Sequence, residues 1–173
     1  FCPADRSERY RKAAAAADVV ILDLEDAVAP GDKAAARQAV VDTPLDPDRT
    51  VIRVNARSTP YFEADLAALS ETAYHRVMVP KCESAQDVSA LAPRSVVALV
   101  ETPLGVLHAA EICAADGCEA MMWGAEDLVA ALDGASSRRV DGTYRDVAVH
   151  ARSTALLAAK AFGRQALDSV YLD

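Results

Sequence analysis

Two acidic residues close consecutive apolar, β-type runs of this 173-residue chain. Glu101 closes SVVALVET, and Asp127 closes the next run, AMMWGAEDL. If these runs are neighbouring parallel strands, their Cα atoms lie roughly 5 Å apart, which is the spacing between strands. Two carboxylates at such a distance repel each other unless a cation or protons intervene. Since carboxylates without soft ligands nearby select Mg²⁺ or Mn²⁺, the pair predicts a hard divalent metal site. Solvated acids that cap the following helices are the alternative.

A cation and three more acids stand at other strand ends. Arg53 lies in TVIRVNA, where its planar fork suits a substrate carboxylate or a carbonyl oxygen that gains charge. Pairing of Arg53 with an acid on the neighbouring strand is a second interpretation, and both can hold. Asp23, Glu25 and Asp26 lie in VVILDLEDAV, and strand alternation puts Asp23 and Glu25 on one face. Because buried acids are costly alone, we expect them to pair with a cation or to hold metal-bound water.

Two further features complete the set of polar strand ends. Lys81 ends RVMVPK and is a further candidate for substrate binding. We expect it to be paired with the nearby acids rather than to form a Schiff base. Gly124, Ala125 and Glu126 form a turn of mostly small residues before a helix. Backbone N–H groups in such a turn bind carboxylates, so these residues are candidates for substrate binding.

The elements that must position these residues alternate between strand and helix. Near-continuous apolar runs are typical of parallel strands buried on both faces, and Phe1–Pro3 adds the tail of one more. The runs are Val19–Asp23, Thr50–Val54, Arg76–Val79, Ser95–Val100, Ala120–Trp123 and Ser169–Leu172. Six helical segments lie between them. Their expected boundaries include starts at Asp32, Thr59-Pro60 and Ser84, and a long helix over Thr143–Phe162 that Gly163 ends.

Alternating strands and helices predict either a doubly wound sheet or a (β/α)₈ barrel. The chain contains no GxGxxG or GxxxxGK[ST] motif, which weakens the case for a nucleotide-binding open sheet. Polar residues recur at strand ends, as they do at the C-terminal face of a barrel. We therefore predict a TIM (β/α)₈ barrel truncated to about seven strands, a single domain over residues 1–173. It is expected to be incomplete at both ends, because the chain starts without Met and stops inside an apolar run.

The composition excludes several classes of partner. A net charge of −8 argues against nucleic acid and against an anionic membrane surface. No apolar run reaches the roughly 18 residues of a membrane span. The four cysteines show no CxxC pairing, so we expect reduced thiols and a cytoplasmic location.

The ordered motifs resemble those of the citrate lyase β-subunit-like proteins of the HpcH/HpaI aldolase/citrate lyase superfamily. FCPADR, VVILDLEDAV, VIRVNA, VMVPKCES, ALVETPLG and MMWGAEDL occur in the family's order over nearly the whole chain. The resemblance implies a (β/α)₈ barrel that is normally followed by a C-terminal segment, which is absent here. It also implies homo-oligomers, with a trimer favoured.

By this resemblance, Glu101 and Asp127 are Mg²⁺ ligands and Arg53 contacts the keto or enolate oxygen of the substrate. Glu25 and Asp26 match the acidic pair that orients metal-bound water, and the backbone from Gly124 to Asp127 holds a carboxylate. The implied reaction is Mg²⁺-dependent carbon–carbon cleavage of a 3-hydroxyacyl-CoA thioester of the citryl- or malyl-CoA type. It yields acetyl-CoA and an oxo product through a metal-stabilised enolate. The substrates expected as partners are a small oxoacid and a CoA thioester.

The resemblance leaves several points open. Arg6 and Arg9 are candidate contacts to the CoA phosphates. In relatives, a catalytic aspartate and a lid come from the C-terminal region, often from a neighbouring subunit, and neither is seen here. A non-catalytic metal- and oxoacid-binding or scaffold subunit is therefore an alternative. A pyruvate-dependent class II aldolase is less favoured, because that branch carries a histidine near the first acidic region and none precedes Thr59.

Overall fold

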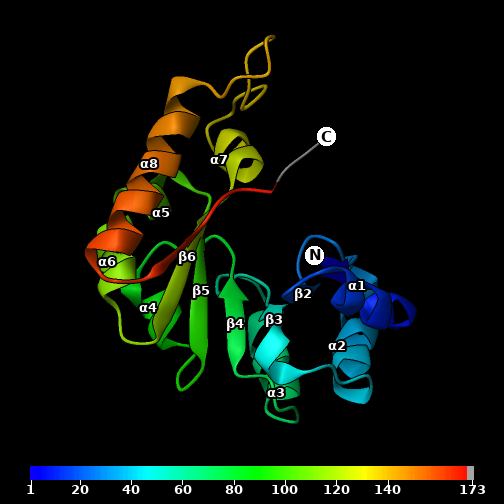
Figure 1. Ribbon diagram of the computed structural model, residues 1–173. Coiled ribbons are helices and arrows are strands. Elements are labelled where there is room, and N and C mark those ends of the chain that lie inside the picture. The colour runs from blue at the N-terminus through cyan, green and yellow to red at the C-terminus, as the bar shows by residue number, and fades with distance from the viewer. Residues whose placement is uncertain (171–173) are drawn as a thin grey trace. The chain divides into compact units, whose positions relative to one another are not determined.

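A computed structural model describes residues 1–170 (Figure 1). Strands and helices alternate along the chain, and the strands pair in parallel within each part of the molecule. The predicted α/β class with about seven strands is confirmed. The contacts divide the chain into two compact units, here called unit 1 and unit 2. Unit 1 comprises Phe1–Val79 and Pro93–Ser95, and unit 2 comprises Pro80–Ala92 and the residues from Val96 onward.

Unit 1 is a parallel sheet whose strands follow one another in chain order. Its strands are β1 (Cys2–Pro3), β2 (Val20–Asp23), β3 (Thr50–Arg53) and β4 (Arg76–Val79). Its helices are η1 (Ser7–Arg9), α1 (Tyr10–Ala16), η2 (Pro30–Asp32), α2 (Lys33–Asp42), η3 (Pro47–Arg49) and α3 (Phe62–Leu69). Leu22, Ile52 and Met78 are fully buried in this sheet. Asp23 stands opposite Arg53 in the register, so two charged side chains meet where β2 and β3 end.

Unit 2 carries the remaining strands under a long helix. Its strands are β5 (Ser95–Val100, with Ser95 grouped in unit 1), β6 (Cys118–Trp123) and β7 (Gln165–Leu167). Its helices are α4 (Ala85–Ser89), α5 (Pro103–Leu107), α6 (Ala109–Ala114), α7 (Ala125–Ala131) and α8 (Asp146–Ala161). Helix α8 packs on α6, β6 and β7 through alanines such as Ala151 and Ala155 (Figure 1). Small side chains let this helix approach the sheet closely.

Two predicted helix starts are wrong, and each error has a local cause. Helix α3 begins at Phe62 instead of Pro60. The N–H and the hydroxyl of Thr59 both donate to the carbonyl of Ala56, at 2.9 and 2.8 Å, and hold Thr59 in a preceding turn. Helix α8 begins at Asp146 instead of Thr143.

Thr143 is likewise held in a turn, because its N–H and hydroxyl donate to Asp141 Oδ1 at 3.0 and 2.6 Å. The capping box at Ser84 is confirmed, with Asp87 Oδ2 accepting from the Ser84 N–H at 3.0 Å. The end of α8 at Gly163 is also confirmed, and φ there is +66°. Asp32 stands at the N-cap of α2, but its side chain accepts no capping hydrogen bond.

The seventh strand is not formed by Ser169–Leu172, as predicted, but by residues that precede this segment. Its last residues fall outside the described part of the chain, and Ser169 is not in a strand. The seventh strand is β7, which pairs with β6 at Ala120–Met122. Just before β7, Arg164 anchors the chain to helix α6, because its Nε donates to the carbonyl of Cys113 at 3.0 Å.

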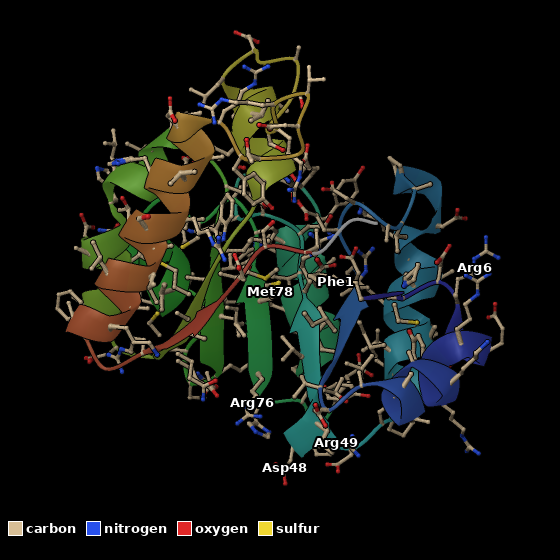
Figure 2. All side chains as sticks on the ribbon, turned by 45° about the horizontal axis from the view of Figure 1, so that its top comes forward. Phe1, Arg6, Asp48, Arg49, Arg76 and Met78 are labelled. Atoms are coloured by element: carbon tan, nitrogen blue, oxygen red, sulfur yellow. The ribbon has the colours of Figure 1, made fainter. Side chains whose placement is uncertain are left out.

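The charged residues at the amino ends of β3 and β4 serve the fold. Figure 2 shows Asp48, Arg49 and Arg76 gathered at this end of unit 1. Arg76 donates to the Asp48 carbonyl at 2.9 Å, and Arg49 donates to the Asp18 carbonyl at 2.9 Å. These guanidinium groups tie loops together. The chemistry must therefore be sought at the carboxyl ends of the strands, as is usual for parallel α/β folds.

Candidate active site

Arg53 and Asp23 form a two-point ion pair at the carboxyl ends of β3 and β2. Arg53 Nε donates to Asp23 Oδ1 at 2.7 Å, and Nη2 donates to Oδ2 at 2.5 Å. Asp23 also accepts from the N–H groups of Glu25 and Ala27, at 2.9 and 3.1 Å. The expected pairing of Arg53 with an acid on the neighbouring strand is confirmed. Asp23 fixes the plane of the guanidinium and also shapes the loop after β2.

Of the two acids predicted to support the site, Glu25 is buried and Asp26 is exposed. Glu25 Oε2 lies 3.1 Å from Arg53 Nη1, so Glu25 faces the same guanidinium as Asp23. Strand β2 ends at Asp23, and Glu25 therefore reaches Arg53 from a loop rather than from the strand. The structure thus brings Asp23, Glu25 and Arg53 together and leaves the Asp26 side chain open to solvent.

A buried polar network supports the loop that carries Glu25. Lys33 Nζ donates to the carbonyls of Leu24 and Glu25 at 2.8 and 3.0 Å. Asn55 Nδ2 donates to the same Leu24 carbonyl at 3.0 Å and to Asp65 Oδ2 at 2.7 Å. Burial lowers the pKa of Lys33, while Asp65 and other nearby acids act to raise it. These hydrogen bonds fix the backbone carbonyls of residues 24 and 25.

The sequence reasoning missed this network, although it contained a signal. Phe62, Asp65 and Leu69 share one face of α3 at helical spacing, and all three are buried. An acid on an otherwise apolar face must find partners. Asp65 accepts hydrogen bonds from Arg37, which donates to Oδ1 at 3.1 Å, and from the backbone N–H of Asn55, which donates to Oδ2 at 2.8 Å.

In unit 2, the two predicted metal ligands both lie near the ammonium of Lys81. Lys81 Nζ lies 3.9 Å from Glu101 Oε1 and 3.6 Å from Asp127 Oδ1. Glu101 follows β5 and is buried, whereas the side chain of Asp127, in the first turn of α7, is 40% exposed. The expected pairing of Lys81 with the acids is confirmed. The arrangement is two carboxylates around one cation.

The backbone of Lys81 is also part of this cluster. Its N–H donates to Glu101 Oε1 at 3.1 Å. Its φ is +49°, in the left-handed region that side chains other than glycine rarely adopt. Such strain persists only where the surroundings impose it, and it is common at functional sites.

Because Gly124 has no side chain, it leaves space for the Glu101 carboxylate. A Cβ at this position would lie 2.5 Å from Glu101 Oε2 and 2.9 Å from its Cβ. The N–H of Gly124 donates to the carbonyl of Val100 at 3.1 Å, so this amide serves the junction between β5 and β6. Of the turn predicted to bind a substrate carboxylate, the Gly124 N–H is therefore used within the fold, and α7 starts at the next residue, Ala125.

The other residues predicted at this turn have structural contacts. Ala125 is buried at the start of α7. Glu126 Oε1 accepts from the hydroxyl of Ser137 at 2.6 Å, and Ser137 is itself buried. Glu126 thereby ties the loop after α7 to the start of this helix.

The two arginines predicted to contact CoA behave differently. Arg6 is exposed, with Asp5 at 3.9 Å, and Figure 2 shows its side chain projecting outward from unit 1. Arg9 lines an open hollow of about 470 Å³ together with Lys12 and Phe1. The hollow offers two cations beside an aromatic ring, which suits a phosphate-bearing ligand better than the position of Arg6 does.

The donor set in unit 2 fits a magnesium ion. Within residues 1–170, no three His, Cys, Asp or Glu side chains converge as a complete metal site. Mg²⁺ commonly takes only one or two protein carboxylates and fills its other positions with water and substrate. Glu101 and Asp127 already hold a cationic group, so the pair can supply those carboxylates.

No helix in the described part of the chain is both long and apolar enough to cross a membrane.

Comparison with known proteins places the chain in a family. The model of the HpcH/HpaI aldolase/citrate lyase family matches residues 1–173. A citrate lyase subunit beta-like protein of Mycobacterium tuberculosis is 67% identical over 173 residues, covering 100% of this chain and 63% of that protein. An L-malyl-CoA/beta-methylmalyl-CoA lyase of Cereibacter sphaeroides is 36% identical over 169 residues, which are 84% of this chain and 53% of the lyase.

A crystal structure of the protein CitE from M. tuberculosis, in complex with magnesium, acetoacetate and coenzyme A, matches with a TM-score of 0.99 and 67% identity. The match covers 100% of this chain and 65% of CitE. The fold is therefore the barrel-type α/β fold of these proteins, and the chain belongs to the HpcH/HpaI aldolase/citrate lyase family. It spans less than two thirds of the length of these relatives.

Proposed function

We propose that this protein is a Mg²⁺-dependent carbon–carbon lyase that acts on a 3-hydroxyacyl-CoA thioester of the citryl- or malyl-CoA type. The observation that carries the proposal is that Glu101 and Asp127 both lie within 4 Å of the Lys81 ammonium, at 3.9 and 3.6 Å. The lyase among the relatives and the complex of CitE with magnesium, acetoacetate and coenzyme A support the same chemistry. Glu101 and Asp127 would hold the metal, and Mn²⁺ would serve in its place.

The residues of the proposed site have separate roles in the reaction. Mg²⁺, when bound, would polarise the carbonyl oxygen of the oxo product. Arg53, fixed by Asp23 and Glu25, donates N–H groups to a substrate oxygen on which negative charge develops. The first turn of α7, from Ala125 onward, receives the substrate carboxylate. Lys81 adds positive charge for the same anionic substrate.

The thioester carrier is proposed to approach unit 1 through its basic hollow. Arg9 and Lys12 present two cations there, and the nucleotide phosphates of CoA are the anions that they suit. A Glu25 side chain held against Arg53 keeps the guanidinium oriented when substrate arrives. Assembly as a homo-oligomer, with a trimer favoured, belongs to the same proposal.

The test is an assay of the full-length protein against a panel of 3-hydroxyacyl-CoA esters, with release of acetyl-CoA measured at varied Mg²⁺ concentrations. Glu101→Gln and Asp127→Asn are expected to lower kcat/KM on the order of 100-fold or more, since charge stabilisation at the reacting oxygen is lost. Glu111→Gln removes an exposed carboxylate from α6 and is the matched control, with activity unchanged.

Two outcomes would revise the proposal in different ways. Activity unaffected by both active-site substitutions would refute the assignment of the metal ligands. No turnover on any ester, together with Mg²⁺-dependent binding of an oxoacid by the full-length protein, would favour a non-catalytic binding subunit.

A further inference from the structure

The carboxyl end of β6 is anchored by the side chain of Trp123, the last residue of this strand. Trp123 is buried, and its indole N–H donates to Asp168 Oδ1 at 2.7 Å. Asp168 directly follows β7 and also pairs with Arg152 of α8. A buried indole N–H normally has such an acceptor, because it would otherwise lose its hydrogen bond to water. The end of β6 is therefore tied to the end of β7 and, through Asp168, to α8.

The Trp123 ring has a second contact, to the loop between α7 and α8. The Tyr144 ring meets it edge-on, with 5.3 Å between the ring centroids and an angle of 69° between the planes. Arg138 lies over the Tyr144 ring at 4.0 Å and donates to the Tyr144 hydroxyl at 2.8 Å. The same loop carries Ser137, whose hydroxyl donates to Glu126 of α7 at 2.6 Å. This loop therefore contacts both the end of β6 and the first turn of α7.

The backbone that Trp123 anchors leads directly into the proposed metal site. Trp123 stands opposite Val100 in the strand register, and the next residues on the two strands are Gly124 and Glu101. A Cβ on Gly124 would lie 2.5 Å from Glu101 Oε2, so a small shift of this backbone changes the space that the carboxylate occupies. Asp127 follows in the first turn of α7. Movement of the end of β6 would therefore change the spacing of both proposed ligands.

We propose that Trp123 is a positioning residue, which fixes the spacing of Glu101 and Asp127 through the backbone that follows β6. The inference rests on the proposed function, because it takes these two carboxylates as the metal ligands. Mg²⁺ demands oxygens at about 2.0–2.1 Å in near-ideal octahedral geometry, so a ligand displaced by a fraction of that distance binds it poorly. Trp123 acts on the ligands through the chain rather than by contact with the metal.

The experiment is a titration of the full-length protein with Mn²⁺, in which electron paramagnetic resonance measures the free ion. Trp123→Phe keeps an aromatic ring and removes the N–H, and Asp168→Ala removes the acceptor. Each is expected to bind Mn²⁺ roughly 5- to 20-fold more weakly than the wild type, in the range typical of residues that orient metal ligands. The double variant should bind no more weakly than the weaker single variant, because both substitutions remove the same bond.

Two further variants separate positioning from a general loss of stability. Asp168→Asn keeps an oxygen that accepts from the indole, and its Mn²⁺ affinity should equal that of the wild type. Tyr74→Phe is the matched control in unit 1, because it removes a buried aromatic side chain's hydrogen bond to the Leu45 N–H, which is 2.8 Å long. It should lower Tm and leave Mn²⁺ binding unchanged. If Trp123→Phe does not fold, Asp168→Ala compared with Asp168→Asn provides the test.

The results separate this inference from the proposed function. Wild-type Mn²⁺ affinity in folded Trp123→Phe and Asp168→Ala would overturn the positioning role. If Glu101→Gln and Asp127→Asn abolish Mn²⁺ binding in the same series, the metal assignment stands even so. If those two variants bind Mn²⁺ as the wild type does, the proposed metal site fails, and the positioning role is refuted with it.

Discussion

Gly124→Ala tests whether the space around Glu101 is required for metal binding. Gly124 has φ −118° and ψ 119°, which alanine adopts without strain, so the substitution changes only the room available. The new Cβ would lie 2.5 Å from Glu101 Oε2, whereas ordinary contact begins at 3.4 Å. The carboxylate must therefore retreat by roughly 1 Å, or the start of α7 must move by a similar distance.

Both responses carry a measurable cost. Overpacking of this kind destabilises proteins by about 1–3 kcal/mol. For a chain of this length, that corresponds to a fall in Tm of roughly 2–10 °C. A metal ligand displaced by about 1 Å also loses its bond, because Mg²⁺ demands oxygens at about 2.0–2.1 Å. We therefore expect Mn²⁺ affinity to fall at least tenfold.

The assay combines thermal unfolding with Mn²⁺ titration in the full-length protein. Gly31→Ala is the matched control, because a Cβ there would meet no atom within 4 Å. It should leave Mn²⁺ binding unchanged and alter stability by less than about 1 kcal/mol. If Gly124→Ala bound Mn²⁺ and unfolded as the control does, the argument from close approach would be refuted.

Three further predictions concern unit 1. Arg53→Met should lower the free energy of unfolding by about 3 kcal/mol in urea titrations, because it leaves Asp23 buried without its guanidinium; a loss below about 1 kcal/mol would contradict this. Asp65→Asn should cost about 2 kcal/mol by the same measurement, since its carboxylate accepts from Arg37 and Asn55, while Asp42→Asn on the exposed side of α2 should cost little. Burial raises the pKa of Tyr10 above its ordinary 10.0, so the folded protein keeps a proton that the unfolded chain releases above that pH. The stability contributed by Tyr10 is present below pH 10 and is lost as the pH rises further. Tyr10→Phe should therefore lose about 1 kcal/mol at pH 7, with its bond to the Ala4 carbonyl, and show a shallower decline above pH 10.

Periodicity and strand ends predicted most of the fold. The near-continuous apolar runs located the strands that end at Asp23, Arg53 and Val79 to within one residue, because parallel strands buried on both faces have few competing patterns. Helix starts were less predictable. Thr59 and Thr143 resemble N-caps in sequence, but each bonds a nearby turn instead. Such choices depend on which acceptor the folded chain places within reach.

The site was predictable in part for a similar reason. That Arg53 pairs with an acid follows from adjacent strand ends, and the register places Asp23 opposite it. The left-handed backbone of Lys81 and the close approach of Gly124 to Glu101 have no local sequence signal. Both arise where a loop meets the end of a neighbouring strand, and only the folded chain brings these parts together.

Among the described residues, each unit brings two carboxylates to one basic side chain, but the contacts in the two clusters differ in length and geometry. In the cluster of unit 1, Asp23 accepts two backbone N–H groups and a short two-point contact from Arg53. A metal there would have to displace a guanidinium and strip hydrogen bonds that shape the loop. In unit 2, the cation is a lysine at 3.6 and 3.9 Å, and Asp127 is partly open to solvent. The longer contacts in unit 2 and the partial exposure of Asp127 are the reasons that the proposed metal ligands are Glu101 and Asp127 rather than Asp23 and Glu25.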